Sequence, residues 1–219
     1  MTMRKPWRWL AAGGELSALA TAAASTPLGF LLRDGEFDPA ARHPTPVVLV
    51  HGLLGNASNF LFLRRVLAAR GIRNLSSFSY LPSVDVPRVA DRLADTIQAV
   101  SDATGGTQVD VVGHSFGGLV ARYMIEMEEG RLVRRLVTLG SPCFTTRLAP
   151  QELALFAAAD ALVRPLHPIH GGSRGRTRVL AGCGHVGLLY HPAALREVTR
   201  YLACPVRLAA VPARQRAVS

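Results

Sequence analysis

The sequence predicts an α/β domain with a mostly parallel central sheet and helices on both of its faces. Short, mainly aliphatic runs alternate along the chain with longer segments whose apolar residues recur at helical spacing. The short runs are typical of strands buried on both faces, and the longer segments are typical of amphipathic helices. Such an alternation indicates parallel strands joined by helical crossovers. The 219 residues suffice for one domain of this kind.

The first half of the domain begins with Val47–Val50, an entirely aliphatic run that predicts a buried strand. A helix is predicted over Asn59–Arg70, where the apolar residues lie on one face and Gly71 provides a stop signal. A weaker strand is expected at 72–79. A second amphipathic helix is then expected over 87–103.

The second half continues the alternation up to residue 203. Its predicted elements are strands at Val109–Val112, Leu132–Leu139, Leu153–Ala158 and Arg178–Ala181, and helices at 116–129 and 192–203. No internal repeat or low-complexity tract interrupts them.

Composition excludes several classes of protein. Hydrophobic residues make up 49% of the chain and charged residues 18%, which is too apolar for a disordered protein. Three cysteines are too few for a disulfide-built scaffold. The net charge of +10 comes almost entirely from scattered arginines, with Lys5 the single lysine, so we expect no nucleic-acid partner.

The N-terminal segment, residues 1–33, has a composition of its own. Arg4, Lys5 and Arg8 precede the stretch Leu10–Leu32, in which Glu15 is the only charged residue. This pattern favours a secretory signal or a membrane anchor, and hence a secreted or membrane-anchored, extracytoplasmic protein. The alternative is an N-terminal helix that packs on the domain.

The remaining boundaries follow from local composition. Residues 34–46 contain three acids and three prolines and are predicted to be a linker. The folded domain is expected to cover residues 47–204. Residues 205–219 lose their hydrophobic periodicity and are expected to form a loose tail.

A motif of the form G-x-S-x-G follows the predicted strand Val109–Val112. It reads Gly113-His114-Ser115-Phe116-Gly117 and is followed by a helical segment. In open α/β sheets, chemistry is concentrated at the carboxyl ends of the strands. A serine on a tight strand-to-helix turn has its hydroxyl lifted clear of the sheet, and the flanking glycines avoid clashes there. Ser115 is therefore predicted to be a nucleophile.

A nucleophilic serine also needs two backbone N–H groups to hold the oxyanion of the tetrahedral intermediate. One is expected from Phe116, the residue after the serine. The other is expected from Leu53, because Gly52 lets the backbone turn inwards after the first strand. His51 and His114 are predicted to support these loops rather than to react.

Four segments of the chain together resemble the small α/β-hydrolase lipases and esterases of bacteria, above all the minimal, lidless Bacillus-type triacylglycerol lipases (class 2 lipases). They are VVLVHGLLGNASNF at 47–60, VDVVGHSFGGLVARYMIE at 109–126, VTLGSP at 137–142 and GCGHVGLLYHPAAL at 182–195. The resemblance extends over about residues 45–203. It implies a compact α/β-hydrolase fold with a minimal lid or none, and a Ser-Asp-His triad in that chain order. Gly113 departs from the smallest family members, which have alanine there.

The general base is expected late in the chain, on a loop after the last strand. His185 meets this condition, because it follows Arg178–Ala181 through Gly182-Cys183-Gly184. His167 and His170 could be read as metal ligands, but the sequence offers no third ligand nearby, so no metal site is predicted. His191 precedes a proline at a helix start and is predicted to be a cap or surface residue.

The acid of the triad should lie between Ser115 and His185, after a strand. Asp160 is the one acid that does so, in a segment that resembles the D-x-x-V acid loop of the family. The other acids considered lie on the helix after Ser115 or at the start of a strand: Glu126, Glu128, Glu129 and Glu152. Asp160 is therefore predicted to orient His185 and to stabilise its imidazolium form.

These residues together predict a serine carboxylic-ester hydrolase, either a triacylglycerol lipase or a carboxylesterase. It would form an acyl-enzyme on lipid or short-to-medium acyl esters, with no metal or organic cofactor. An acyltransferase or thioesterase with the same triad is an alternative, as is a non-catalytic, membrane-anchored binding protein on the same fold. We expect a monomer whose partners are an ester or lipid substrate and, as an option, a membrane or lipid surface.

Two further expectations concern the lid and the thiols. At most 18 residues lie between Ser141 and Asp160, which leaves little room for a helical lid. The thiols of Cys143, Cys183 and Cys204 are expected to have no catalytic role, and the sequence leaves any disulfide among them open.

Overall fold

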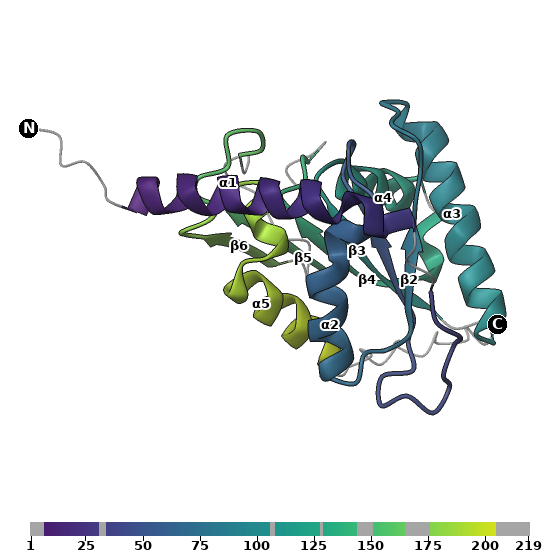
Figure 1. The fold of residues 1–219 in the computed structure, drawn as a ribbon. Coiled ribbons are helices and arrows are strands. Elements are labelled where there is room, and N and C mark those ends of the chain that lie inside the picture. Colours follow the sequence, from purple (N-terminus) through teal and green to yellow (C-terminus); the bar gives the residue numbers. More distant parts are fainter. Residues whose placement is uncertain are drawn as a thin grey trace, which may run out of the picture.

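A six-stranded sheet forms the centre of the computed structural model, which describes residues 7–30, 34–105, 108–127, 129–143, 151–164 and 176–204. The strand order is β2-β1-β3-β4-β5-β6, and every neighbouring pair is parallel (Figure 1). The strands are β1 (Val47–Val50), β2 (Leu75–Phe78), β3 (Val109–His114), β4 (Val133–Leu139), β5 (Glu152–Ala157) and β6 (Arg176–Leu180).

Helices cover both faces of the sheet, as the sequence predicts. The α-helices are α1 (Trp7–Ser25), α2 (Leu61–Ala69), α3 (Val86–Ala103), α4 (Phe116–Glu126) and α5 (Pro192–Ala203). Short 3₁₀ helices are η1 (Thr26–Phe30), η2 (Ala57–Phe60), η3 (Glu129–Leu132) and η4 (Val186–Leu189). Helices α2 and α5 lie on one face, and α3 and α4 pack together on the other (Figure 1).

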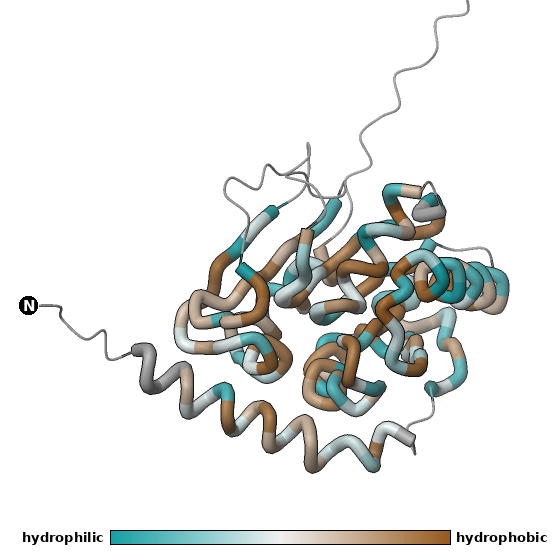
Figure 2. Tube along the Cα trace, turned by 90° about the horizontal axis from the view of Figure 1, so that it is seen from above, coloured by the Kyte–Doolittle hydropathy of each residue, from teal (hydrophilic) through white to brown (hydrophobic). Residues whose placement is uncertain are grey.

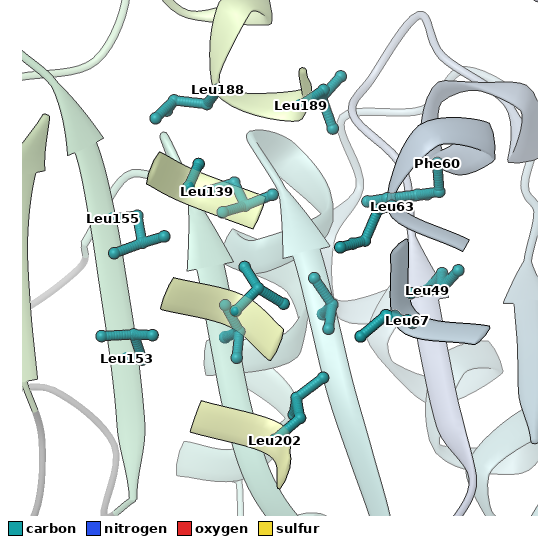
Figure 3. Close-up of a cluster of buried hydrophobic side chains, with 14 of the residues drawn as sticks. Leu49, Phe60, Leu63, Leu67, Leu139, Leu153, Leu155, Leu188, Leu189 and Leu202 are labelled. Atoms are coloured by element: carbon teal, nitrogen blue, oxygen red, sulfur yellow. The ribbon is translucent and has the colours of Figure 1, made fainter. Parts of the chain in front are cut away.

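The alternation of side chains along the strands explains why the two largest hydrophobic cores lie on opposite faces of the sheet. In β1, Val47 and Leu49 point into the core under α2 and α5, whereas Val48 and Val50 point into the core under α3 and α4. The first core is rich in leucine (Figure 3). Burying a leucine of this kind stabilises the fold by about 1.5–3 kcal/mol.

The direction of chain progression reverses between β1 and β3. The chain places β2 on one side of β1 and all later strands on the other side, beginning with β3. At this switch point Val50 is paired with Gly113, so the loops that leave β1 and β3 start side by side. Crevices at such switch points are where open α/β sheets bind their ligands. The loop that carries Leu53 and the turn that carries Ser115 both begin here.

All the predicted strands and helices are present, but some of their bounds differ. Strand β3 extends two residues further than expected, through Gly113 and His114. Helix α4 ends at Glu126, three residues before the predicted end. Glu128 and Glu129 come shortly after Glu126 in the sequence, and negative charge is unfavourable at the C-terminal end of a helix dipole.

The N-terminal helix α1 lies along the outside of the domain (Figure 2). It contacts η4, and η1 contacts η2. The sequence analysis gave a packed helix as the alternative to a secretory signal or membrane anchor. Within the described part of the chain, no helix combines the length and the hydropathy that crossing a bilayer requires.

Residues 34–46, predicted as a linker, run beside β2 and bond to it. Asp34 accepts hydrogen bonds from the Ser77 backbone N–H and the Ser76 hydroxyl, at 2.8 and 3.0 Å. The Asn74 side chain is hydrogen bonded to the backbone of Asp38 in both directions. The predicted tail, residues 205–219, lies outside the described residues.

Candidate active site

Ser115 occupies the tight turn between β3 and α4. Its backbone has φ 52° and ψ −121°, a positive-φ conformation that non-glycine residues seldom adopt. The turn is held on the sheet side, where Ser115 N–H donates to the Leu139 carbonyl at 2.8 Å. Strain of this kind persists only where the surrounding structure enforces it, and it is concentrated at functional sites.

The two glycines of the motif allow close backbone packing around this turn. A Cβ on Gly113 would lie 2.5 Å from the Gly118 Cα, and a Cβ on Gly117 would lie 2.3 Å from the Val50 carbonyl oxygen. Neither position has room for a side chain. The steric reason for the G-x-S-x-G pattern that the sequence predicted is therefore present in the structure.

His185 reaches Ser115 from the loop between β6 and η4. Its Nε2 lies 2.9 Å from the Ser115 Oγ, although the residues are 70 positions apart. The His185 side chain is buried, and the Ser115 side chain is partly exposed. A hydroxyl at this distance can donate its proton to a neutral imidazole.

Asp160 lies on the other side of the imidazole. Its Oδ2 is 2.8 Å from His185 Nδ1, while its Oδ1 accepts hydrogen bonds from the N–H groups of Leu162 and Val163, both at 2.8 Å. Burial alone would raise the pKa of Asp160. The hydrogen bonds from His185, Val163 and Leu162 outweigh burial, and the pKa is lowered from its ordinary value. The carboxylate is therefore ionised at neutral pH.

The loop after β1 packs directly against the serine. A Cβ on Gly52 would lie 3.2 Å from the Ser115 Cβ, so the backbone approaches the serine closely. Gly55 N–H donates to the Gly52 carbonyl at 3.0 Å and closes a turn that carries Leu53 at its corner. Phe116 is the first residue of α4, where a helix leaves N–H groups without an intrahelical partner.

His51 stabilises the Gly52–Gly55 turn, as the sequence analysis predicted. Its Nδ1 lies 2.8 Å from the Gly52 carbonyl oxygen, and its ring stacks on Tyr80 with 4.5 Å between centroids. The Tyr80 hydroxyl donates to the His51 carbonyl at 2.8 Å. Burial lowers the pKa of His51, so this imidazole is held neutral.

His114 supports the base loop in a similar way. Its Nε2 lies 3.2 Å from the His185 carbonyl oxygen, so Nε2–H donates to that oxygen. Burial, with a smaller contribution from the neighbouring His185, lowers the pKa of His114 to about 3. His114 is therefore a neutral donor at ordinary pH.

Gly140, which sequence reasoning did not single out, lies beneath the His185–Asp160 pair. It follows β4 and has φ +56°. A Cβ at this position would lie 3.1 Å from His185 Nδ1 and 3.3 Å from Asp160 Oδ2. Only glycine leaves this pair undisturbed. The LGSP sequence at the end of β4 was the available signal.

Residues 47–176 match the model of the alpha/beta hydrolase family. The chain belongs to this family. Two curated relatives are similar to part of the chain, both named triacylglycerol lipase. That of Pseudarthrobacter phenanthrenivorans is 35% identical over 108 residues, which cover 44% of this chain and 33% of the relative. That of Burkholderia plantarii is 35% identical over 108 residues, which cover 44% of this chain and 29% of the relative. The alignment thus spans about a third of the length of either curated relative.

Solved structures are similar to this α/β-hydrolase in fold. Lipase B of Aspergillus fumigatus superimposes with a TM-score of 0.64 and 14% identity, over 78% of this chain and 55% of that one. The HSL-homolog EstE7 from a metagenome library superimposes with a TM-score of 0.63 and 14% identity, over 92% of this chain and 99% of that one. At these identities the likeness concerns the fold alone.

The competing acid Glu152 has a different environment in this α/β-hydrolase. It is fully buried at the start of β5 and accepts hydrogen bonds from Arg122 and from the Thr138 hydroxyl. Arg122 also donates to the carbonyls of Ser141 and Pro142. Glu152 thus belongs to a network that ties α4 to β4 and β5.

The other residues that the sequence analysis considered are His191, the three cysteines, His167 and His170. His191 precedes α5 but makes no side-chain capping hydrogen bond. Cys143, Cys183 and Cys204 are free thiols. His167 and His170 lie outside the described residues, and within the described ranges no three His, Cys, Asp or Glu side chains cluster as metal ligands would.

Proposed function

We propose that this α/β-hydrolase is a serine carboxylic-ester hydrolase in which Ser115, His185 and Asp160 act as a catalytic triad. The observation that supports this most is the continuous hydrogen-bonded path from Ser115 Oγ through both nitrogens of His185 to Asp160 Oδ2. Acyl transfer requires a nucleophile, a general base and an acid that orients the base. Along this hydrogen-bonded path the three groups follow one another in that order.

The first half of the reaction acylates the serine. Ser115 Oγ attacks the ester carbonyl carbon while His185 Nε2 takes the hydroxyl proton. The backbone N–H groups of Leu53 and Phe116 hold the oxyanion of the tetrahedral intermediate. When the intermediate collapses, the C–O bond to the alcohol breaks, and His185 returns the proton to the leaving oxygen.

The second half releases the acid. Water attacks the acyl carbon, His185 takes a proton from it, and the acyl–Ser115 bond breaks as the serine regains the proton from His185. Asp160 remains ionised throughout and stabilises the imidazolium that forms twice in each cycle. The lowered pKa of Asp160 is consistent with this role.

Exposed aliphatic side chains around the site support an ester with an acyl chain as the substrate. Leu54, Leu81 and Leu162 are 87%, 83% and 77% exposed, in the loops that follow β1, β2 and β5. These loops leave the same edge of the parallel sheet as Ser115 does. Lipid or short-to-medium acyl esters fit such a rim, and the name triacylglycerol lipase of two relatives supports the same class.

The test is hydrolysis of a series of p-nitrophenyl esters from acetyl to palmitoyl, beside emulsified triacylglycerol, with the Ser115→Ala variant as the background control. We expect turnover of several esters by the wild type and none above background by the variant. Equal rates for the two proteins would contradict the proposal. An acyl thioester is assayed beside these oxygen esters, and turnover of the thioester alone would show a thioesterase instead.

A further inference from the structure

Glu15 contacts the base loop from the far N-terminal part of the chain. It is the only charged residue between Leu10 and Leu32, and it lies on α1. Its Oε1 accepts a hydrogen bond from Val186 N–H at 2.7 Å, and its Oε2 accepts one from Gly187 N–H at 2.9 Å. Both donors immediately follow His185. Hydrogen bonds to a carboxylate are shorter and about twice as strong as those between neutral groups.

The peptide unit that links His185 to Val186 is thereby held from both sides. Its N–H donates to Glu15, and its C=O accepts from His114 Nε2 at 3.2 Å. The backbone orientation of His185 sets where its imidazole points. A misplacement of about 1 Å in a catalytic group costs on the order of 100-fold in rate, so a fixed peptide plane here has direct consequences for catalysis.

The glycines of the base loop provide the space for this carboxylate. A Cβ on Gly184 would lie 2.5 Å from Glu15 Oε2, and one on Gly187 would lie 3.0 Å from the same atom. The negative charge of Glu15 also affects the thiol of Cys183. Burial first, and then the charges of Glu15 and Asp160, raise the pKa of the Cys183 thiol to about 11.

The other end of the N-terminal segment is attached beside the oxyanion loop. Asn56 Nδ2 donates to the Thr26 carbonyl at 2.9 Å, and the hydroxyls of Ser25 and Ser58 are 3.3 Å apart. Asn56 directly follows the turn Gly52–Gly55 and caps η2. Helix α1, together with η1, thus connects the loop of the base with the loop of the predicted oxyanion donor Leu53.

We propose that Glu15 is a positioning residue, which holds the His185–Val186 peptide so that the imidazole stays aligned with Ser115. This inference rests on the proposed function, because Glu15 acts through His185. The N-terminal helix α1 then contributes to catalysis, because it carries the residue that positions the base. The next residue on the helix, Leu16, is 70% exposed.

The test compares the wild type, residues 1–219, with Glu15→Gln and with Leu16→Gln, a matched change on the exposed side of the same helix. The glutamine keeps the shape of the side chain but places an NH₂ group against one backbone N–H. For p-nitrophenyl butyrate we expect kcat of Glu15→Gln to fall about tenfold while KM stays within about twofold, because Glu15 does not touch the substrate. Leu16→Gln should match the wild type. Glu15→Asp, which keeps the charge, should recover part of the lost kcat.

A purely structural anchor predicts another result. Glu15→Gln would then melt at a lower temperature yet keep its kcat, within about twofold, well below that temperature. That outcome would overturn the inference. If Glu15→Gln fails to fold, amide hydrogen exchange of the wild type decides, since Val186 and Gly187 should exchange slowly and free-loop rates would contradict the contact.

Failure of the proposed function gives a different pattern. Ser115→Ala is measured in the same series. If it keeps wild-type activity, the proposed triad is wrong whatever Glu15→Gln does. If Ser115→Ala is inactive and Glu15→Gln behaves as the wild type, only the role of Glu15 is wrong.

Discussion

Asp160 holds His185 with one carboxylate oxygen and is itself held by the backbone with the other. Oδ2 lies 2.8 Å from His185 Nδ1, and Oδ1 accepts from Leu162 and Val163 at 2.8 Å each. The carboxylate therefore has little freedom to rotate, and it imposes the tautomer in which Nδ1 carries the proton. Nε2 is then left as an acceptor for the proton of Ser115.

Replacing Asp160 by asparagine should leave the fold intact and disable the base. The amide can no longer impose the reactive tautomer on His185. In a serine-protease triad the same change costs on the order of 10⁴ in kcat. This equals about 5.5 kcal/mol at ~1.4 kcal/mol per decade. Steady-state kinetics on a p-nitrophenyl ester measures the loss.

Glu152→Gln is the matched control, because Glu152 is the only other acid between Ser141 and His185. Removing its charge leaves Arg122 buried without its ionic partner, which costs about 3–5 kcal/mol of stability. Activity per folded molecule should persist. Should Glu152→Gln abolish kcat while Asp160→Asn stays within about tenfold of the wild type, the acid has been misassigned.

Stability should fall as pH falls below about 6.5, in part because of His114. The pKa of His114 is lowered to about 3 in the folded state. As the pH falls, His114 therefore binds its proton in the unfolded chain at a higher pH than in the folded protein. The stabilisation from the neutral His114 is complete above about 6.5 and is lost progressively down to about 3, at about 1.4 kcal/mol per pH unit. Urea unfolding of the wild type and His114→Asn across this window measures the difference. Parallel slopes for the two proteins would rule out this contribution.

Much of the site was predictable because its residues stand at recognisable places in the strand–helix alternation. Ser115 follows a strand within a G-x-S-x-G, and Asp160 and His185 each follow a later strand. Parallel strands bring their carboxyl ends to one edge, so these distant residues meet. The close packing around Gly113 and Gly117 is also a local feature, and the G-x-S-x-G motif predicts it.

Glu15 and Gly140 were not predictable in the same way. The partners of Glu15 are backbone N–H groups more than 170 positions away, and backbone groups leave no trace in a sequence. The one sign in the sequence was a single carboxylate within an apolar stretch. This sign is compatible with a secretory signal of low hydrophobicity and equally with an N-terminal helix packed on the domain. Gly140 serves by leaving space under two side chains, which only the folded arrangement reveals.

Removing residues 1–33 should impair the protein. Helix α1 buries Ala18 and bonds to the base loop through Glu15, so a protein that begins at Asp34 exposes apolar surface and loses this support. We expect aggregation in detergent-free buffer and a lower kcat in the soluble fraction. Size-exclusion chromatography and ester hydrolysis measure both. A monodisperse, fully active product would instead favour the signal or anchor interpretation.

Activity should rise smoothly with ester concentration, without a jump at the solubility limit. At most 18 residues separate Ser141 from Asp160, and Ser115 is partly exposed. A site that is open in solution gains nothing from an interface. The measurement is the initial rate across the solubility limit of a short-chain triacylglycerol. Sharp activation at that limit would show that another segment covers the serine.

The most direct test of the account is the reactivity of Ser115. A serine-directed phosphonate should label the wild type stoichiometrically, and mass spectrometry of the digested protein should find the adduct on Ser115 alone. Ser115→Ala should fold as the wild type does, hydrolyse no ester above background and take up no label. Stoichiometric labelling of Ser115→Ala, or ester hydrolysis by it at the wild-type rate, would contradict the central claim that Ser115 is the nucleophile.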